Sequence, residues 1–302
     1  MIIKDFNQVY QLAGEMGPRK MAVLAPEDIE FLKSLKHVCK DGLIEAVFIG
    51  DQEKMKIAAD QADFDLDSIE KIYASDYQKI ANQGVAMLFN GEVDIVGKGR
   101  IPTSFIYRAV INEEKTRGKM ENISVISLWE TPAKDHLIAI TDSGVNILPD
   151  YKTKKEILKT ALFVMLLLGY TNPQVVILSA QRKNSPPLVS YTDAQKLREE
   201  FSHDAKSSCT IRPEHSLAQF FGEKEDNGSL PHIVIVPDLD TGNILVKLDF
   251  MLNVIRCSIV LSSKGPLIIP SRADFCDSII REISLGVFLA AKIKEETTVA
   301  KY

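Results

Sequence analysis

Short apolar runs rich in Val and Ile recur along the chain, and most are separated by enough residues for a helix. Clear examples are "MAVLA" (21–25), "EAVFIG" (45–50), "QVVILSA" (174–180), "HIVIVPD" (232–238) and "PLIIP" (266–270). Continuous apolar runs of this length, separated by helices, are typical of parallel strands buried on both faces of a sheet. The pattern therefore predicts the α/β class.

The segments between these runs have the spacing of amphipathic helices. After the first run, Ile29, Leu32, Leu35 and Val38 recur every three residues, which predicts a helix with one buried face. The apolar run "ALFVMLLL" (161–168) is too short to cross a bilayer, and we interpret it as a buried helix.

One region departs from this rhythm. Two strand candidates, 123–129 and 137–141, lie on either side of the turn "ETPAKD", which leaves no room for a crossover helix and predicts a hairpin. Such a departure often marks a second domain, and 302 residues suffice for two,. We predict a discontinuous first domain, residues 1–118 plus 270–302, and a second domain, residues 119–269.

Charge, cysteines and the N-terminus exclude several classes of protein. The formal net charge is -5 without a Lys/Arg run, so no nucleic-acid partner is predicted. The cysteines form no C-x-x-C pair and the histidines no metal-binding spacing, so neither a metal site nor a disulfide framework is predicted. The N-terminus lacks the pattern of a signal peptide. We therefore expect a cytoplasmic protein with no membrane partner.

The stretch "DIVGKGRIPTSFIYRAV", from Asp94, combines a strand end with a helix start. Lys98, Gly99 and Arg100 end the strand, Thr103 stands near the helix start, and Arg108 follows within the helix. Glycines allow close approach of a ligand, and helix N-terminal amides with nearby cations favour a bound phosphate. The spacing matches neither a P-loop nor a dinucleotide fingerprint. A glycine turn with solvated cations is the alternative interpretation.

Two more polar stretches follow strand candidates. "TDSGVNILPD" (141–150) contains Asp142, and "VPDLDTGNILVKLDFML" (236–252) carries Asn243 in a polar turn and Lys247 in the following helix. Polar groups at the carboxyl ends of parallel strands are well placed to line a ligand crevice. Ordinary turns and helix starts explain the same residues. A calcium loop is not indicated, because the D-x-D-x-D-G-x5-E pattern is absent.

The last stretch, "IIPSRADFCDSIIREISLGVFLAAKIK" from Ile268, runs from a strand into a helix. One interpretation is that Ser271 simply caps this helix, with Asp274 completing an arrangement like a capping box. The helix is expected to bury a stripe made of Ile279, Ile283, Val287 and Ala290. Arg272 is unexplained by capping, because a cation at a helix N-terminus is unfavourable unless it has an anionic partner.

In this order, the four stretches resemble the phosphate acetyltransferase and phosphate butyryltransferase family over most of the chain. The pattern is closer to the butyryl branch, which carries S-R-A-D where the acetyl branch has S-R-G. The resemblance implies a two-domain isocitrate/isopropylmalate-dehydrogenase-like fold with mainly parallel sheets and an interdomain cleft. It also implies a homo-oligomer that interconverts a short-chain acyl-CoA plus phosphate with acyl phosphate plus CoA, with coenzyme A as a substrate and without a metal or redox cofactor.

The resemblance also implies roles for residues. Ser271 and Arg272 fall on the serine and arginine that bind the acyl phosphate and stabilise its transition state, and Arg108 falls on a second phosphate-binding arginine. The acetyl branch has its thiol base seven positions after the serine, where this chain has a serine preceded by Asp277. Asp277 is therefore the candidate base, with Asp274 as the substitute. The remaining candidates for substrate binding are Lys98, Gly99, Thr103, Asp142, Asn243 and Lys247.

Two segments, 179–194 and 211–228, depart from the family pattern. They leave open a change in acyl-chain or CoA recognition, or a non-catalytic, regulatory paralogue that binds CoA or acyl phosphate on the same fold. A metal- and NAD-dependent dehydrogenase with this fold is a third hypothesis.

Overall fold

The computed structural model describes residues 1–118, 122–203, 209–213, 216 and 230–299. The chain divides into two compact units. The flanking unit comprises Phe6–Ile123 and Cys257–Tyr302, and the mid-chain unit comprises Met1–Asp5 and Ser124–Arg256.

The two predicted domains, with boundaries near residues 118 and 270, remain a prediction, because compact units need not be domains that fold independently. The compact units differ from them mainly over residues 257–269, which fall in the flanking unit. The reason is local, because strand β11 (Pro266–Ile268) pairs with strand β4 (Ile95–Lys98) of that unit.

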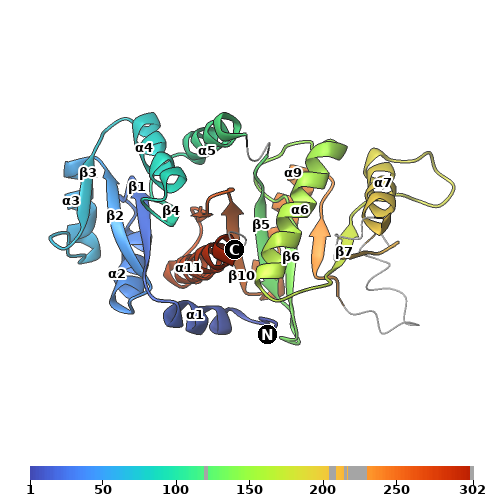
Figure 1. The fold of residues 1–302 in the computed structure, drawn as a ribbon, viewed down its shortest axis with the longest axis horizontal. Coiled ribbons are helices and arrows are strands. Elements are labelled where there is room, and N and C mark those ends of the chain that lie inside the picture. The colour runs from blue at the N-terminus through green and yellow to red at the C-terminus, as the bar shows by residue number, and fades with distance from the viewer. Residues whose placement is uncertain (119–121, 204–208, 214–215, 217–229, 300–302) are drawn as a thin grey trace. The chain divides into compact units, whose positions relative to one another are not determined.

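The flanking unit contains a mainly parallel sheet, which confirms the predicted α/β class. Its strands follow the order β3-β2-β1-β4-β11-β10 (Figure 1). Neighbouring strands are parallel except that β10 runs antiparallel to β11. Besides β4 and β11, the strands are β1 (Arg19–Leu24), β2 (Ile44–Gly50), β3 (Glu70–Tyr73) and β10 (Arg256–Leu261).

Six helices of this unit lie among its described residues: α1 (Phe6–Glu15), α2 (Ile29–Lys40), α3 (Gln52–Ala62), α4 (Tyr77–Asn90), α5 (Thr103–Arg117) and α11 (Cys276–Val299). Helix α11 packs against α1 and α2, while α4 packs against α5 (Figure 1). The sheet order reverses at β1, with β2 on one side and β4 on the other. Right-handed crossovers therefore place α2 and α4 on opposite faces of the sheet.

Helix α11 begins later than expected. The predicted stripe is confirmed, since Ile279, Ile283, Val287 and Ala290 are all buried. The interpretation of Ser271 as a helix cap is wrong, because the helix starts at Cys276. Residues 271–275 instead form a separate turn before the helix.

The strands of the mid-chain unit follow the order β5-β6-β9-β7-β8. Strands β5 and β6 pair antiparallel, which confirms the predicted hairpin, and the other pairs are parallel. The strands are β5 (Val125–Glu130), β6 (Leu137–Thr141), β7 (Gln174–Ile177), β8 (Thr210–Ile211) and β9 (Ile233–Ile235). The helices in the described part of this unit are α6 (Tyr151–Leu167), α7 (Val189–His203), α9 (Leu239–Val246) and α10 (Asp249–Leu252). Helix α6 contains most of the apolar run interpreted as a buried helix.

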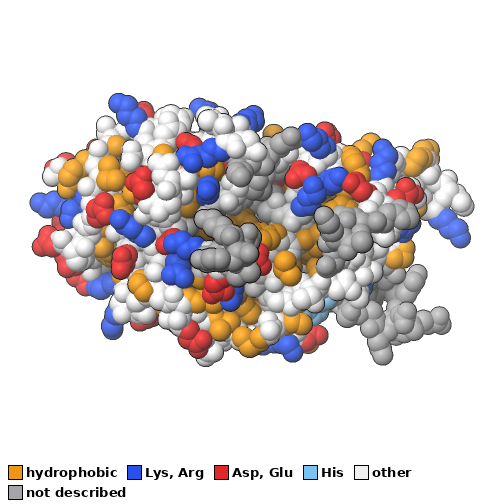
Figure 2. Space-filling model, in the orientation of Figure 1, with side chains coloured by type: hydrophobic (Ala, Val, Ile, Leu, Met, Phe, Trp, Pro, Cys, Tyr) orange, Lys and Arg blue, Asp and Glu red, His pale blue; other side chains and the backbone are white. Residues whose placement is uncertain are grey.

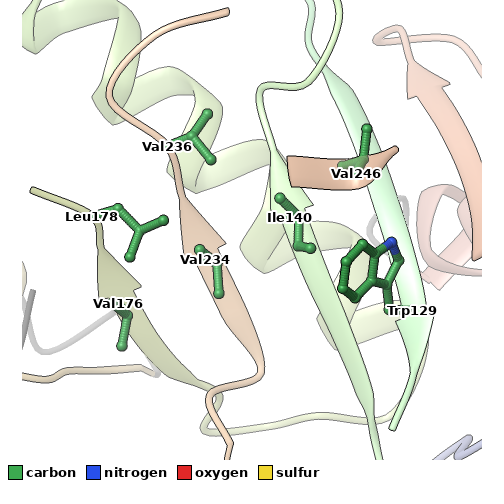
Figure 3. Packing of buried hydrophobic residues seen from close by; sticks show 7 residues of the cluster. All are labelled: Trp129, Ile140, Val176, Leu178, Val234, Val236 and Val246. Atoms are coloured by element: carbon green, nitrogen blue, oxygen red, sulfur yellow. The ribbon is translucent and has the colours of Figure 1, made fainter. Parts of the chain in front are cut away.

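The core of the mid-chain unit shows how its strands and a helix share one apolar layer. The indole of Trp129 on β5 lies beside Ile140 of β6 and Val246 of α9 (Figure 3). Val176 and Val234 extend the cluster across β7 and β9. Because these side chains come from segments distant in sequence, their burial holds the hairpin against the parallel strands.

The surface carries both signs of charge, and Lys/Arg and Asp/Glu side chains are interspersed on the face shown in Figure 2. None of the helices in the described ranges combines the length and apolar character that a bilayer span requires.

Candidate active site

A pocket of about 560 Å³ opens in the flanking unit where three parallel strands end. The register pairs Leu24 of β1 with Lys98 of β4, and Ile268 of β11 with Gly97 of β4. The loops after the three strands therefore meet at one edge of the sheet, beside the point where the strand order reverses. Open α/β sheets usually bind ligands at this position. The pocket is lined by residues 28–31, 98–103, 270–272, 274 and 279.

Gly99 is required by the close approach of two strand ends. A Cβ atom at this position would lie 2.1 Å from the carbonyl oxygen of Ala25, which is backbone and cannot rotate away. The amides of Gly99 and Arg100 donate to the carbonyl oxygens of Leu24 and Ala25 at 2.9 and 2.8 Å. These contacts fix the backbone that carries Lys98 and Arg100.

Several features of the pocket favour an anion. Lys98, Arg100 and Arg272 all line it. Helix α5 also begins there after Pro102, which supplies no side-chain acceptor for the first-turn N–H groups. Unsatisfied N–H groups and the helix dipole attract negative charge.

The charge on Lys98 is tuned by its surroundings. Burial lowers the pKa of Lys98 from the ordinary value of 10.5, attraction by Asp28 opposes this, and repulsion from Arg272 adds to the lowering. The Lys98 Nζ atom donates to the carbonyl oxygen of Pro270 at 3.4 Å. Asp28 also lies 4.0 Å from the Nε atom of Arg100. Because Glu30 and Asp274 line the pocket too, it mixes cations with carboxylates.

The turn that carries Ser271 and Arg272 is held at both ends. The Ser271 amide donates to Asp274 Oδ2 at 2.6 Å, and the Asp274 amide donates to the Ser271 carbonyl oxygen at 3.0 Å. Beyond the turn, the amide of Cys276 donates to Glu30 Oε2 at 3.3 Å. The reciprocal bond expected of a capping box is thus present, but it closes a turn rather than the helix.

Five predicted site residues line this one pocket: Lys98, Gly99, Thr103, Ser271 and Arg272. Asp277 does not line it; its side chain is exposed in the first turn of α11. Asp274, the substitute base, does line the pocket.

Arg108 also lies outside the lining. It is exposed on α5, where its Nη1 atom donates to Gln78 Oε1 at 3.4 Å and its guanidinium lies 6.0 Å from the centre of the Phe105 ring.

The remaining predicted residues belong to the mid-chain unit. Asp142 is buried and accepts backbone hydrogen bonds on Oδ1 from Val125, Gly144 and Val145. Its Oδ2 accepts two more from the backbone and side-chain amides of Asn146. This carboxylate organises the loop after β6, which favours the ordinary-turn interpretation of Asp142.

Asn243 and Lys247 lie on or beside α9. The Asn243 side-chain amide donates to the Ser143 carbonyl oxygen at 3.3 Å, and Lys247 is exposed at the helix C-terminus. The predicted polar turn at 238–243 is mostly helical, because Asp238 caps α9 by accepting from the Thr241 amide. A Cβ atom at Gly242 would lie 2.4 Å from the Asp142 carbonyl oxygen, so glycine allows α9 to approach this loop.

Sequence reasoning missed the contribution of α2 to the pocket. Asp28, Ile29 and Glu30 line it, and so does Arg100, which was noted in its motif but not chosen. The available signal was the "PED" that directly follows the first strand run, since a loop after a parallel strand is a preferred ligand position.

Within the described part of the chain, no three His, Cys, Asp or Glu side chains form a group that could hold a metal ion. The segment 179–194 departs from the family pattern. Its first part, 179–188, is a loop in which Gln181 forms hydrogen bonds with Ser185 and Leu188, and α7 follows this loop. Most of 211–228 lies outside the described residues.

Comparison with known proteins places similarity along nearly the whole chain. The family described as "Phosphate acetyl/butaryl transferase" matches residues 75–210. A phosphate butyryltransferase of Clostridium acetobutylicum is 24% identical over 298 residues, covering 96% of this chain and 99% of the relative. A phosphate acetyltransferase of Rickettsia prowazekii is 26% identical over 301 residues, covering 96% and 86%. The crystal structure of a branched-chain phosphotransacylase from Enterococcus faecalis V583 superposes with a TM-score of 0.73 at 21% identity, covering 89% of this chain and 98% of that one.

Proposed function

We propose that this chain is a phosphate acyltransferase. The family match and the full-length relatives confirm the resemblance to the phosphate acetyl/butyryl transferase family. The enzyme interconverts a short-chain acyl-CoA plus phosphate with acyl phosphate plus CoA. One observation carries the proposal: Lys98 lies far in sequence from the adjacent Ser271 and Arg272, yet all three line a single pocket beside the point where the strand order reverses.

The reaction explains why cations matter more than a protein nucleophile. A phosphate oxygen attacks the thioester carbonyl and CoA leaves as a thiolate; in reverse, the thiolate attacks acyl phosphate and phosphate leaves. Negative charge develops on the carbonyl oxygen in both directions, and fixed donors stabilise it. Lys98 and Arg272 hold the phosphoryl group, and the Ser271 hydroxyl donates to the carbonyl oxygen.

The thiol of CoA also needs a base, because a thiol with a pKa near 8.5 is mostly protonated at neutral pH. We assign this role to Asp274 in preference to Asp277, since Asp274 lines the pocket and Asp277 is exposed outside it. In the opposite direction, the attacking hydrogen phosphate loses its proton to this carboxylate, and the resulting carboxylic acid passes the proton to the thiolate as CoA leaves.

Finer features belong to the same proposal. They are the isocitrate/isopropylmalate-dehydrogenase-like arrangement with an interdomain cleft, and contributions of Arg108, Asp142, Asn243 and Lys247 to substrate binding. A homo-oligomeric state, a cytoplasmic location and a reaction without metal or redox cofactor are also predictions. The resemblance supports each of them.

The test is phosphate-dependent release of free thiol from acetyl-, propionyl- and butyryl-CoA. We expect turnover by the wild type and a loss of about 10²–10³-fold in kcat/KM for Arg272→Ala, the range found when one transition-state donor is removed. Lys56→Ala is the matched control, because Lys56 is an exposed cation on α3 of the same unit. Binding of CoA without turnover of any acyl-CoA, by a folded wild type, would contradict the proposed function.

A further inference from the structure

The pocket is lined by apolar side chains as well as by charged ones. Phe31, Ile101 and Ile279 belong to its lining and are almost completely buried. Ile29 also lines it and differs from them, because part of its surface stays exposed.

The position of Ile29 on its helix explains why its side chain stays partly exposed. Ile29 was predicted to share a buried stripe with Leu32, Leu35 and Val38, and those three are fully buried. Ile29 is the first residue of α2 and follows the loop that connects β1 to this helix. Its side chain therefore contributes to the pocket wall rather than to the core.

The neighbours of Ile29 keep an anion away from it. Asp28 and Glu30 flank it in sequence and line the same pocket. Both carboxylates have partners, since Asp28 faces Arg100 and caps α2, and Glu30 accepts from Lys33 Nζ at 2.8 Å. A phosphoryl group is attracted to Lys98 and Arg272, whereas beside Ile29 the two carboxylates repel it and their pairing with Arg100 and Lys33 reduces the attraction of those cations,. An apolar group attached to it gains free energy by covering the exposed surface of Ile29.

We propose that Ile29 is a specificity-determining residue that contacts the aliphatic acyl chain and limits its length. The inference rests on the proposed function and goes beyond it by naming the wall that selects the acyl group. The Ile29 side chain favours an unsubstituted aliphatic acyl group, because it has no polar atom to pair with a substituent and the neighbouring Asp28 and Glu30 repel a carboxylate,.

The test compares kcat/KM for acetyl-, butyryl- and hexanoyl-CoA among the wild type, Ile29→Ala, Ile29→Val and Ile29→Phe. Removing wall volume favours the longer chain, and one methylene in a hydrophobic pocket is worth about tenfold or more. We expect the hexanoyl-to-acetyl ratio to rise about tenfold in Ile29→Ala, by less in Ile29→Val, and to fall in Ile29→Phe. The KM for phosphate should stay within about twofold, because the wall does not bind the phosphoryl group.

Ile57→Ala is the control, since Ile57 is 57% exposed on α3 of the same unit and lies outside the pocket lining. Turnover by the wild type with unchanged chain-length ratios in all three folded Ile29 variants would overturn this inference and leave the proposed function standing. Absence of turnover by the wild type with every acyl-CoA would instead overturn the proposed function. Ile29→Val removes a single methyl group and keeps the comparison possible if the larger changes destabilise the fold.

Discussion

Lys98 is a pocket cation whose charge depends on the protein around it. Burial lowers its pKa from the ordinary 10.5, and repulsion from Arg272 acts in the same direction. A lysine is charged below its pKa, so a lowered pKa means that the charge is lost at a lower pH than usual. Phosphate binding should therefore weaken as pH rises through the pKa of Lys98.

We predict that Lys98→Arg moves the alkaline limb of kcat/KM for phosphate to higher pH, because arginine stays charged throughout. The measurement is a pH profile of wild type and variant with phosphate as the varied substrate, with Lys56→Arg as the control for an exposed lysine. If the alkaline limb of Lys98→Arg lay at the same pH as that of the wild type, the ionisation behind this limb would belong to another group.

His232 should make the stability of the mid-chain unit depend on pH. Its ring lies 5.0 Å from that of His136 and 5.1 Å from that of Tyr170, and its Nδ1 atom accepts from the Gln174 amide at 2.9 Å. Burial, and then repulsion from His136 and Arg212, lower the pKa of His232 from 6.5 to about 4. The unfolded chain therefore binds a proton near pH 6.5 that the folded protein rejects until about pH 4, so stability falls as pH drops through this window,.

We predict that His232→Asn shows a shallower fall, since asparagine keeps an acceptor but does not titrate. Denaturant unfolding at pH 7 and pH 5 measures the difference for variant and wild type. Equal falls in both proteins would contradict the assignment to His232.

At the scale of elements, two glycines should respond to alanine in opposite directions. At Gly99 a Cβ atom would lie 2.1 Å from a backbone oxygen, so the ends of β1 and β4 would have to separate. Gly14 lies within α1 with no atom within 4 Å of an added Cβ.

We expect Gly14→Ala to stabilise the protein by up to about 1 kcal/mol, the difference in helix propensity. Gly99→Ala should destabilise it by more than about 2 kcal/mol, the range for severe packing and backbone strain. Denaturant unfolding of both variants gives the two signs, and a neutral Gly99→Ala would show that β1 and β4 can part without cost.

The strands and helices were largely predictable because buried positions take apolar residues at the period of the element, as in the apolar stripes of α2 and α11. The start of α11 was not, because it depends on a distant contact. The Ser271–Asp274 pattern correctly indicated a hydrogen bond, but the bond closes a turn. The helix begins five residues after Ser271, at Cys276, whose amide is held by Glu30 of α2. Local patterns cannot reveal such a partner.

At the scale of the whole molecule, the sequence motifs identified individual site residues. Which of these residues lie close together in the fold depends on the order of the strands. Lys98 and Ser271 lie 173 positions apart and come together because β4 and β11 are neighbouring parallel strands. The sequence offers no spacing that specifies this pairing. The contribution of Ile29 and Glu30 was missed for the same reason, since β1 pairs with β4 on its other side.

This convergence predicts that a small anion stabilises the protein as a whole. A ligand that binds only the folded state raises the free energy of unfolding by about 2.7 kcal/mol at a concentration of 100 times its Kd. Inorganic phosphate should therefore raise the thermal midpoint of the wild type, relative to chloride at equal ionic strength. Arg272→Ala should lose most of the increase, and Lys56→Ala should keep it. An equal increase in Arg272→Ala would mean that phosphate acts elsewhere, and that the cations at the ends of β4 and β11 do not form one phosphate site.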